Sequence, residues 1–111
     1  MQITTETFGN VMVVHTPDEM TEETAERFLA ALEEAVGRGI VYVVAQMDRS
    51  ETYDSAGLTA LLDGQDRLRE KGGNLKICGL QDPGRKIFEI TRLDQRFDIF
   101  ESVIDAVASF R

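Results

Sequence analysis

The most restrictive feature of the sequence is a continuous apolar run at residues 40–45, Ile-Val-Tyr-Val-Val-Ala, in which four of the six side chains are β-branched. A run this short is typical of a strand, and a strand without polar alternation is buried on both faces, as in a parallel sheet. Parallel neighbours need long crossover connections, which are usually helices. The run therefore predicts an α/β fold with helices on both faces of its sheet.

Strand signals elsewhere in the chain extend this prediction. Two β-type runs, residues 3–8 and 11–14, flank the turn signal Gly9-Asn10 and predict an N-terminal hairpin. A further strand is expected at residues 75–78, and a short edge strand at 97–100.

Helix signals alternate with these strands. The first helix is expected to have Thr21 as its N-cap and to stop at Gly37, and the second to follow Asp54-Ser55 and to end before residues 72–73. The third is expected to use Asp82 as its N-cap, with a proline at the first helical position. It carries Ile87 and Ile90, and the last helix carries Val103, Ile104, Val107 and Phe110.

Together these elements predict a single α/β domain over residues 1–111, with four helices. Its sheet is expected to be mixed but mostly parallel, with four to five strands and an N-terminal hairpin.

Composition narrows the classes of partner. The formal net charge of −8 argues against nucleic acid and against an anionic membrane surface, because both attract clustered Lys and Arg. The single cysteine, Cys78, permits no intramolecular disulfide and favours a reducing compartment. We find neither a secretory signal pattern nor an apolar run of membrane-spanning length, so we expect a cytoplasmic protein.

The residue types needed for common catalytic sites are scarce. His15 is the only histidine and is expected at a solvated strand end, whereas Cys78 is expected to be a small buried apolar residue. One histidine and one cysteine make a zinc site improbable. The spacings of phosphate-binding glycine loops and of the serine nucleophile elbow are missing. We therefore expect no enzyme activity, no metal and no cofactor.

One segment remains as a functional candidate: Asp-Ser-Ala-Gly-Leu, residues 54–58, where a helix begins beyond the carboxyl end of the apolar strand. Its structural interpretation is capping, because Asp54 or Ser55 can satisfy free N–H groups at the helix start. Its functional interpretation is an exposed serine at a helix N-terminus, where a phosphate is well accommodated. In that interpretation the small residues Ala56 and Gly57 let another protein approach.

The same segment carries a family resemblance. Residues 53–58, followed by Leu61-Leu62, resemble the Asp-Ser-[Ser/Ala]-Gly-Leu signature of STAS domains, the anti-sigma factor antagonist family. Residues 71–77, 85–94 and 97–100 extend the likeness over nearly the whole chain. The chain departs from the family pattern twice. Residues 17–20, ending in Met20, stand where Gly-x-[Leu/Ile]-Asp is usual, and Gln46 stands where an acidic residue commonly ends the strand.

The resemblance implies a partner-switching regulator. Such a protein binds a serine-kinase anti-sigma factor, is inactivated when that kinase phosphorylates the motif serine, and is restored by a PPM-type phosphatase. Ser55 would be the phosphoacceptor, and the kinase would bring ATP and Mg²⁺. The resemblance implies a partner-binding surface and a monomer or weak dimer; the surface comprises Asp54, Ser55, Ala56, Gly57, Asp18, Glu19, Met20 and Asp48. The alternative is a STAS interaction module that does not switch, such as a stressosome-like scaffold or a soluble subunit of a lipid-transport complex.

Overall fold

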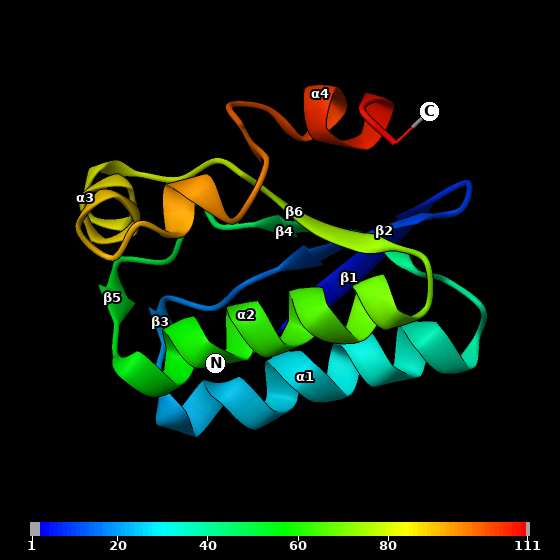
Figure 1. Cartoon of the computed structure of the whole chain (residues 1–111), viewed down its shortest axis with the longest axis horizontal. Helices are drawn as coiled ribbons and strands as arrows, with labels where there is room; N and C mark the ends of the chain where they lie inside the picture. The colour runs from blue at the N-terminus through cyan, green and yellow to red at the C-terminus, as the bar shows by residue number, and fades with distance from the viewer. Residues whose placement is uncertain (1–2, 111) are drawn as a thin grey trace.

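The computed structural model describes residues 3–110, and its centre is a five-stranded mixed sheet (Figure 1). The spatial order is β1-β2-β4-β6-β7, in which β1 is antiparallel to β2 and the other neighbours are parallel. The strands are β1 (Thr4–Phe8), β2 (Val11–His15), β4 (Tyr42–Gln46), β6 (Asn74–Cys78) and β7 (Ile99–Phe100). The predicted mixed sheet with an N-terminal hairpin and a short edge strand is confirmed.

Helices cover both faces of this sheet, as the apolar run predicts. Figure 1 shows α1 (Glu22–Gly37) and α2 (Ser55–Glu70) side by side on one face, with the short α4 (Val103–Ala108) on the other. Helix α3 (Asp82–Ile90) and the 3₁₀ helix η1 (Leu93–Gln95) lie toward the carboxyl ends of the parallel strands. None of the described helices is long and apolar enough to cross a membrane.

Strand β4 shows why its sequence has no polar alternation. Val43 and Ala45 are fully buried in the cluster formed with α1 and α2. Val44 is equally buried on the opposite face, in the cluster that includes Ala106 of α4. Each face of the strand therefore needs apolar side chains.

Two very short strands form a second sheet that the sequence analysis did not predict. Strand β3 (Glu19–Met20) pairs in parallel with β5 (Thr52–Tyr53), just before α1 and α2 begin. Two residues are too few to show an alternating pattern, so only the pairing of distant segments defines these strands. They bring the starts of the two helices together.

Helix α3 differs from its prediction in two respects. Its N-cap is Gln81, so Asp82 is the first helical residue. There the negative charge of Asp82 interacts favourably with the helix dipole, but Asp82 is not the residue that caps the helix. The prediction that Asp82 is the cap is therefore wrong by one residue. Ile90 is 75% exposed, because the face packed on the protein carries Gly84 and Phe88, four residues apart, and Ile90 projects away from that face.

Candidate functional site at the start of helix α2

Helix α2 begins directly after β5, and Asp54 is its N-cap. Asp54 has extended backbone angles (φ −119°, ψ 178°), and its Oδ1 accepts a hydrogen bond from the Gly57 N–H at 2.8 Å. The predicted cap is thus confirmed, and of the two candidates it is the aspartate. Thr21 likewise occupies the predicted N-cap position of α1.

Ser55 is left free by this arrangement. It is the first helical residue of α2 and is exposed. Within residues 3–110 its hydroxyl has no hydrogen-bond partner. A modification of Ser55 would therefore change the surface of the protein without removing the cap of α2.

The second carboxylate oxygen of Asp54 reaches the other helix. Its Oδ2 accepts a hydrogen bond from the backbone N–H of Glu22, the first residue of α1, at 3.0 Å. One carboxylate thus accepts hydrogen bonds at the N-termini of two helices, where the helix dipoles are positive. The N–H groups of Gly57 and then Glu22 hold the pKa of the Asp54 carboxyl below its ordinary value.

Gly57 is buried against the backbone of β3. A Cβ atom at Gly57 would lie 1.8 Å from the carbonyl oxygen of Met20, which also accepts the Asp54 N–H at 3.2 Å. The close approach that this glycine permits is therefore made by β3 of the same chain. Ala56, its neighbour, is half-buried.

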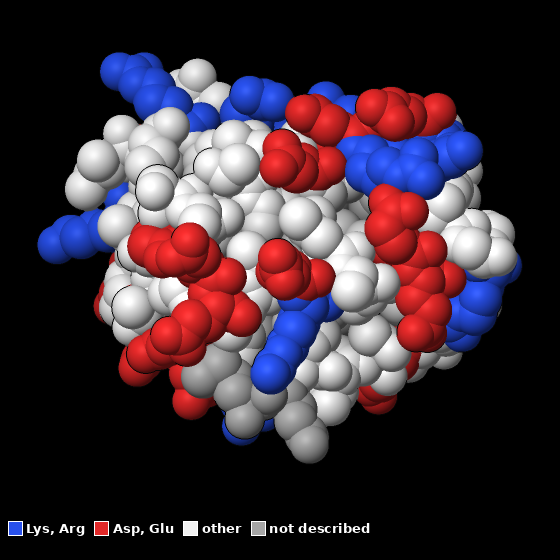
Figure 2. Space-filling view, turned by 90° about the horizontal axis from the view of Figure 1, so that it is seen from below, with Lys and Arg blue, Asp and Glu red and all other residues white. Residues whose placement is uncertain are grey.

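The other residues of the predicted partner surface divide into exposed and buried groups. Asp18, Glu19 and Asp48 are exposed: Asp18 and Asp48 lie on the connections that lead into β3 and β5, and Glu19 is the first residue of β3. The carbonyl of Asp18 accepts the Glu51 N–H at 2.9 Å, which joins the two connections. Figure 2 shows one group of acidic side chains toward its left side, the end at which α1 and α2 begin in Figure 1, and further acidic groups toward its right side.

Met20 is fully buried, and its side chain belongs to the main core. It therefore supports the predicted partner surface from beneath, and Thr21 follows it as the N-cap of α1.

A buried polar cluster that the sequence analysis missed supports the segment before the motif. The hydroxyl of Ser50 is fully buried, lies 2.7 Å from the Thr16 hydroxyl, and donates to the Pro17 carbonyl. The Tyr53 hydroxyl donates to the Ser50 carbonyl at 3.2 Å, and burial raises the pKa of Tyr53 to about 12. Ser50 occurs in a polar stretch, so nothing in its sequence neighbourhood signals burial.

The remaining candidates lie outside this site. His15 ends β2 as predicted, but it is only a quarter exposed, and its Nε2 lies 2.7 Å from Glu6 Oε1. Cys78 is fully buried as predicted, and desolvation raises its pKa to about 11. Gln46 is half-buried, and its carbonyl accepts the Thr16 N–H. The described residues contain no group of His, Cys, Asp and Glu arranged to hold a metal ion.

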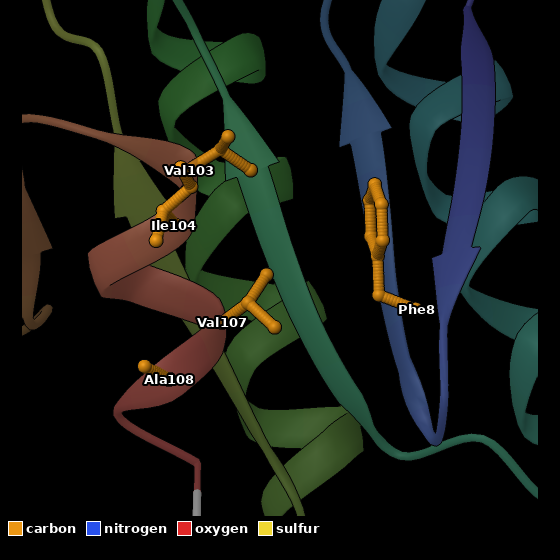
Figure 3. Close-up of a pocket in the computed structure, with 5 residues that line it drawn as sticks. All are labelled: Phe8, Val103, Ile104, Val107 and Ala108. Atoms are coloured by element: carbon orange, nitrogen blue, oxygen red, sulfur yellow. The ribbon is translucent and has the colours of Figure 1, made fainter.

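An apolar groove occurs between strand β1 and helix α4. Figure 3 shows Val103 and Val107 of α4 directed toward the strands, where Phe8 of β1 forms the other side. The groove has a volume of about 330 Å³. It lies on the sheet face opposite α1 and α2, so it is separate from Ser55.

Comparison with known proteins identifies the family. A family model described as the STAS domain matches residues 2–106. The chain belongs to the STAS domain family. Among curated relatives of this STAS domain is the anti-sigma F factor antagonist of Paenibacillus polymyxa, 22% identical over 108 residues, which cover 96% of this chain and 92% of the relative.

Solved structures agree with this fold. The anti-sigma factor antagonist SpoIIAA in its unphosphorylated form has a TM-score of 0.84 at 17% identity, covering 99% of this chain and 96% of SpoIIAA. The Bacillus cell fate determinant SpoIIAA in the phosphorylated form has a TM-score of 0.76 at 18% identity, covering 99% and 100%. At these identities the likeness establishes the STAS fold and no more.

Proposed function

We propose that this STAS domain is a cytoplasmic anti-sigma factor antagonist switched by phosphorylation of Ser55. While Ser55 is unmodified, it binds a serine-kinase anti-sigma factor, and phosphorylation by that kinase ends the complex. A PPM-type phosphatase restores the binding form. The protein itself acts as a binding partner, without catalysis or cofactor.

The observation that carries this proposal is the division of roles between neighbouring residues. Asp54 caps α2, so the exposed Ser55 hydroxyl is free to accept a phosphate. Phosphorylation adds about −1.5 to −2 charge at neutral pH beside the Asp54 carboxylate. This charge would disrupt a closely packed interface, while the cap and the helix are retained. The names of the relatives support the same function.

The proposed interface surrounds Ser55 and is acidic. Asp18, Glu19 and Asp48 are exposed there with Asp54, whereas Met20 and Gly57 support the surface from beneath. An acidic surface favours a partner with a basic binding patch.

The test is phosphorylation by the serine-kinase anti-sigma factor with ATP and Mg²⁺, followed by mapping of the phosphate by mass spectrometry. We expect phosphate on Ser55 in the wild type and in Thr59→Ala, which removes an exposed hydroxyl one turn away. Ser55→Ala should bind the kinase but remain unmodified. Ser55→Asp should bind at least about tenfold more weakly, which corresponds to about 1.4 kcal/mol.

Both Ser55 variants should keep the far-ultraviolet circular dichroism spectrum of the wild type, because Asp54 remains the cap. An active kinase that leaves Ser55 unmodified would contradict the switch. That result would favour a non-switching STAS module, such as a stressosome-like scaffold or a subunit of a lipid-transport complex.

A further inference from the structure

The Asp54 carboxylate joins two helices that start far apart in the sequence. Its two oxygens accept N–H groups from Gly57 in the first turn of α2 and from Glu22 at the start of α1. Among residues 3–110, no other hydrogen bond links the first turn of α1 to the cap or first turn of α2. The β3–β5 pairing and the Asp54 N–H to Met20 carbonyl bond bring the two segments together, and within the helices themselves the spacing of the starts depends on this carboxylate and on packing around Gly57.

We propose that Asp54 is a positioning residue, whose bond to Glu22 holds the starts of α1 and α2 at the spacing that the kinase requires. The inference rests on the proposed function and concerns the surface that presents Ser55. For a partner that contacts the starts of both helices, binding depends on the distance between them as well as on the serine. Loss of the bond leaves the cap of α2 intact but lets the two starts move relative to each other.

Exposure distinguishes this role from a stabilising one. Asp54 and Glu22 lie on the surface, so water replaces a lost hydrogen bond at little cost to the fold. An error of about 1 Å in the position of a reacting group, by contrast, can lower an enzymatic rate about 100-fold. The proposal therefore predicts a larger effect on phosphorylation than on stability.

The chain offers a variant that removes the donor without touching Asp54 or Ser55. Glu22 is the first residue of α1, a position that accepts proline, so Glu22→Pro deletes the N–H and retains the helix. Thr21 before it is extended (φ −135°, ψ −178°), as a residue preceding proline requires. Glu22→Ala is the matched control, because it removes the same side-chain charge and keeps the N–H.

A second variant removes the acceptor. Asp54→Asn retains one side-chain oxygen for the Gly57 N–H, and asparagine caps helices about as well as aspartate. Its amide nitrogen cannot accept the Glu22 N–H. Glu22→Pro and Asp54→Asn thus break the same bond from opposite sides, and their combination tests whether they act through it.

The experiment measures kcat/KM for phosphorylation of Ser55 by the serine-kinase anti-sigma factor, and the pKa of the Asp54 carboxyl by NMR. We expect Glu22→Pro and Asp54→Asn each to lower kcat/KM by roughly tenfold, and the double variant to lower it no further. The pKa of Asp54 should rise in Glu22→Pro relative to Glu22→Ala, because only the proline variant lacks the donor.

Two results would overturn the inference. The first is an Asp54 pKa that is the same in Glu22→Pro and Glu22→Ala, which shows that the bond is absent in solution whatever the kinase does. The second is normal phosphorylation of both single variants, or losses that multiply in the double variant. Failure of the wild type to be phosphorylated is a different result and contradicts the proposed function itself.

Discussion

At the residue scale, the tightest constraint is the contact between Gly57 of α2 and the Met20 carbonyl of β3. A methyl group at Gly57 would overlap that oxygen, at a separation of 1.8 Å. Backbone atoms cannot rotate away as the end of a side chain can. The clash therefore outweighs the gain of about 1 kcal/mol that alanine brings to a helix interior.

Gly57→Ala should accordingly lower the free energy of unfolding by about 1–3 kcal/mol, the usual range for overpacking. The change in the free energy of unfolding is measured by urea denaturation, with circular dichroism as the signal. Gly37→Ala is the matched control, because nothing lies within 4 Å of a Cβ atom at that position in α1. The control should be neutral or stabilising, and equal losses in the two variants would show that the Met20 contact is not the cause.

Residue-scale features differ in how far the sequence reveals them. The caps of α1 and α2 are local, so residue type and spacing indicated Thr21 and the pair Asp54-Ser55. The bond from Glu22 to Asp54 joins residues 32 positions apart and is therefore invisible to spacing. The predicted roles of Ser55 and its neighbours in partner binding stay predictions.

At the scale of elements, α4 is the helix with the least support of its own. It spans six residues, and an isolated helix of that length is unstable in water. Lys76 of β6 contacts the residues that follow the C-terminus of α4. Its Nζ donates a hydrogen bond to Ser109 Oγ at 2.9 Å and lies 4.3 Å from the centre of the Phe110 ring. The side chain of Lys76 is only 12% exposed, so these contacts are largely shielded from water.

Lys76→Met should lower the free energy of unfolding by about 1–2 kcal/mol, because methionine retains the apolar stem but loses the bonds to Ser109 and the cation–π contact. Hydrogen exchange should accelerate at residues 103–110 more than in α1. Lys86→Met, on the exposed surface of α3, is the control and should change neither quantity. Unchanged exchange in α4 would contradict the role given to Lys76.

The elements themselves show where sequence patterns suffice. The apolar run at residues 40–45 correctly indicated a strand buried on both faces, although β4 begins two residues later, at Tyr42. The hairpin was readable because its pairing is local. Strands β3 and β5 were not, because each pairs only with a segment brought close by the rest of the fold.

At the scale of the whole molecule, the feature that bears on partner binding is the negative charge of the protein, part of which lies near Ser55. The net charge is −8, and exposed carboxylates surround the starts of the two helices. Long-range attraction between such a surface and a basic partner raises the association rate, and salt screens it.

The association rate constant with the kinase should therefore fall about tenfold between low and high ionic strength, whereas dissociation should change little. Stopped-flow mixing at several salt concentrations measures both. Glu23→Gln, in the first turn of α1, should slow association more than Glu101→Gln, which lies just before α4 on the other side of the sheet. Equal effects of the two variants on the association rate constant would mean that this rate depends on the net charge of the protein and not on where the charges lie.

The separation of the cap from the free hydroxyl also bears on how such a chain evolves. Asp54 is constrained by folding, since its side chain caps α2, whereas the Ser55 side chain makes no hydrogen bond within residues 3–110. A lineage can therefore lose or regain the hydroxyl by a single substitution without passing through an unfolded intermediate. Regulation at this position is free to drift or be selected independently of the fold that presents it.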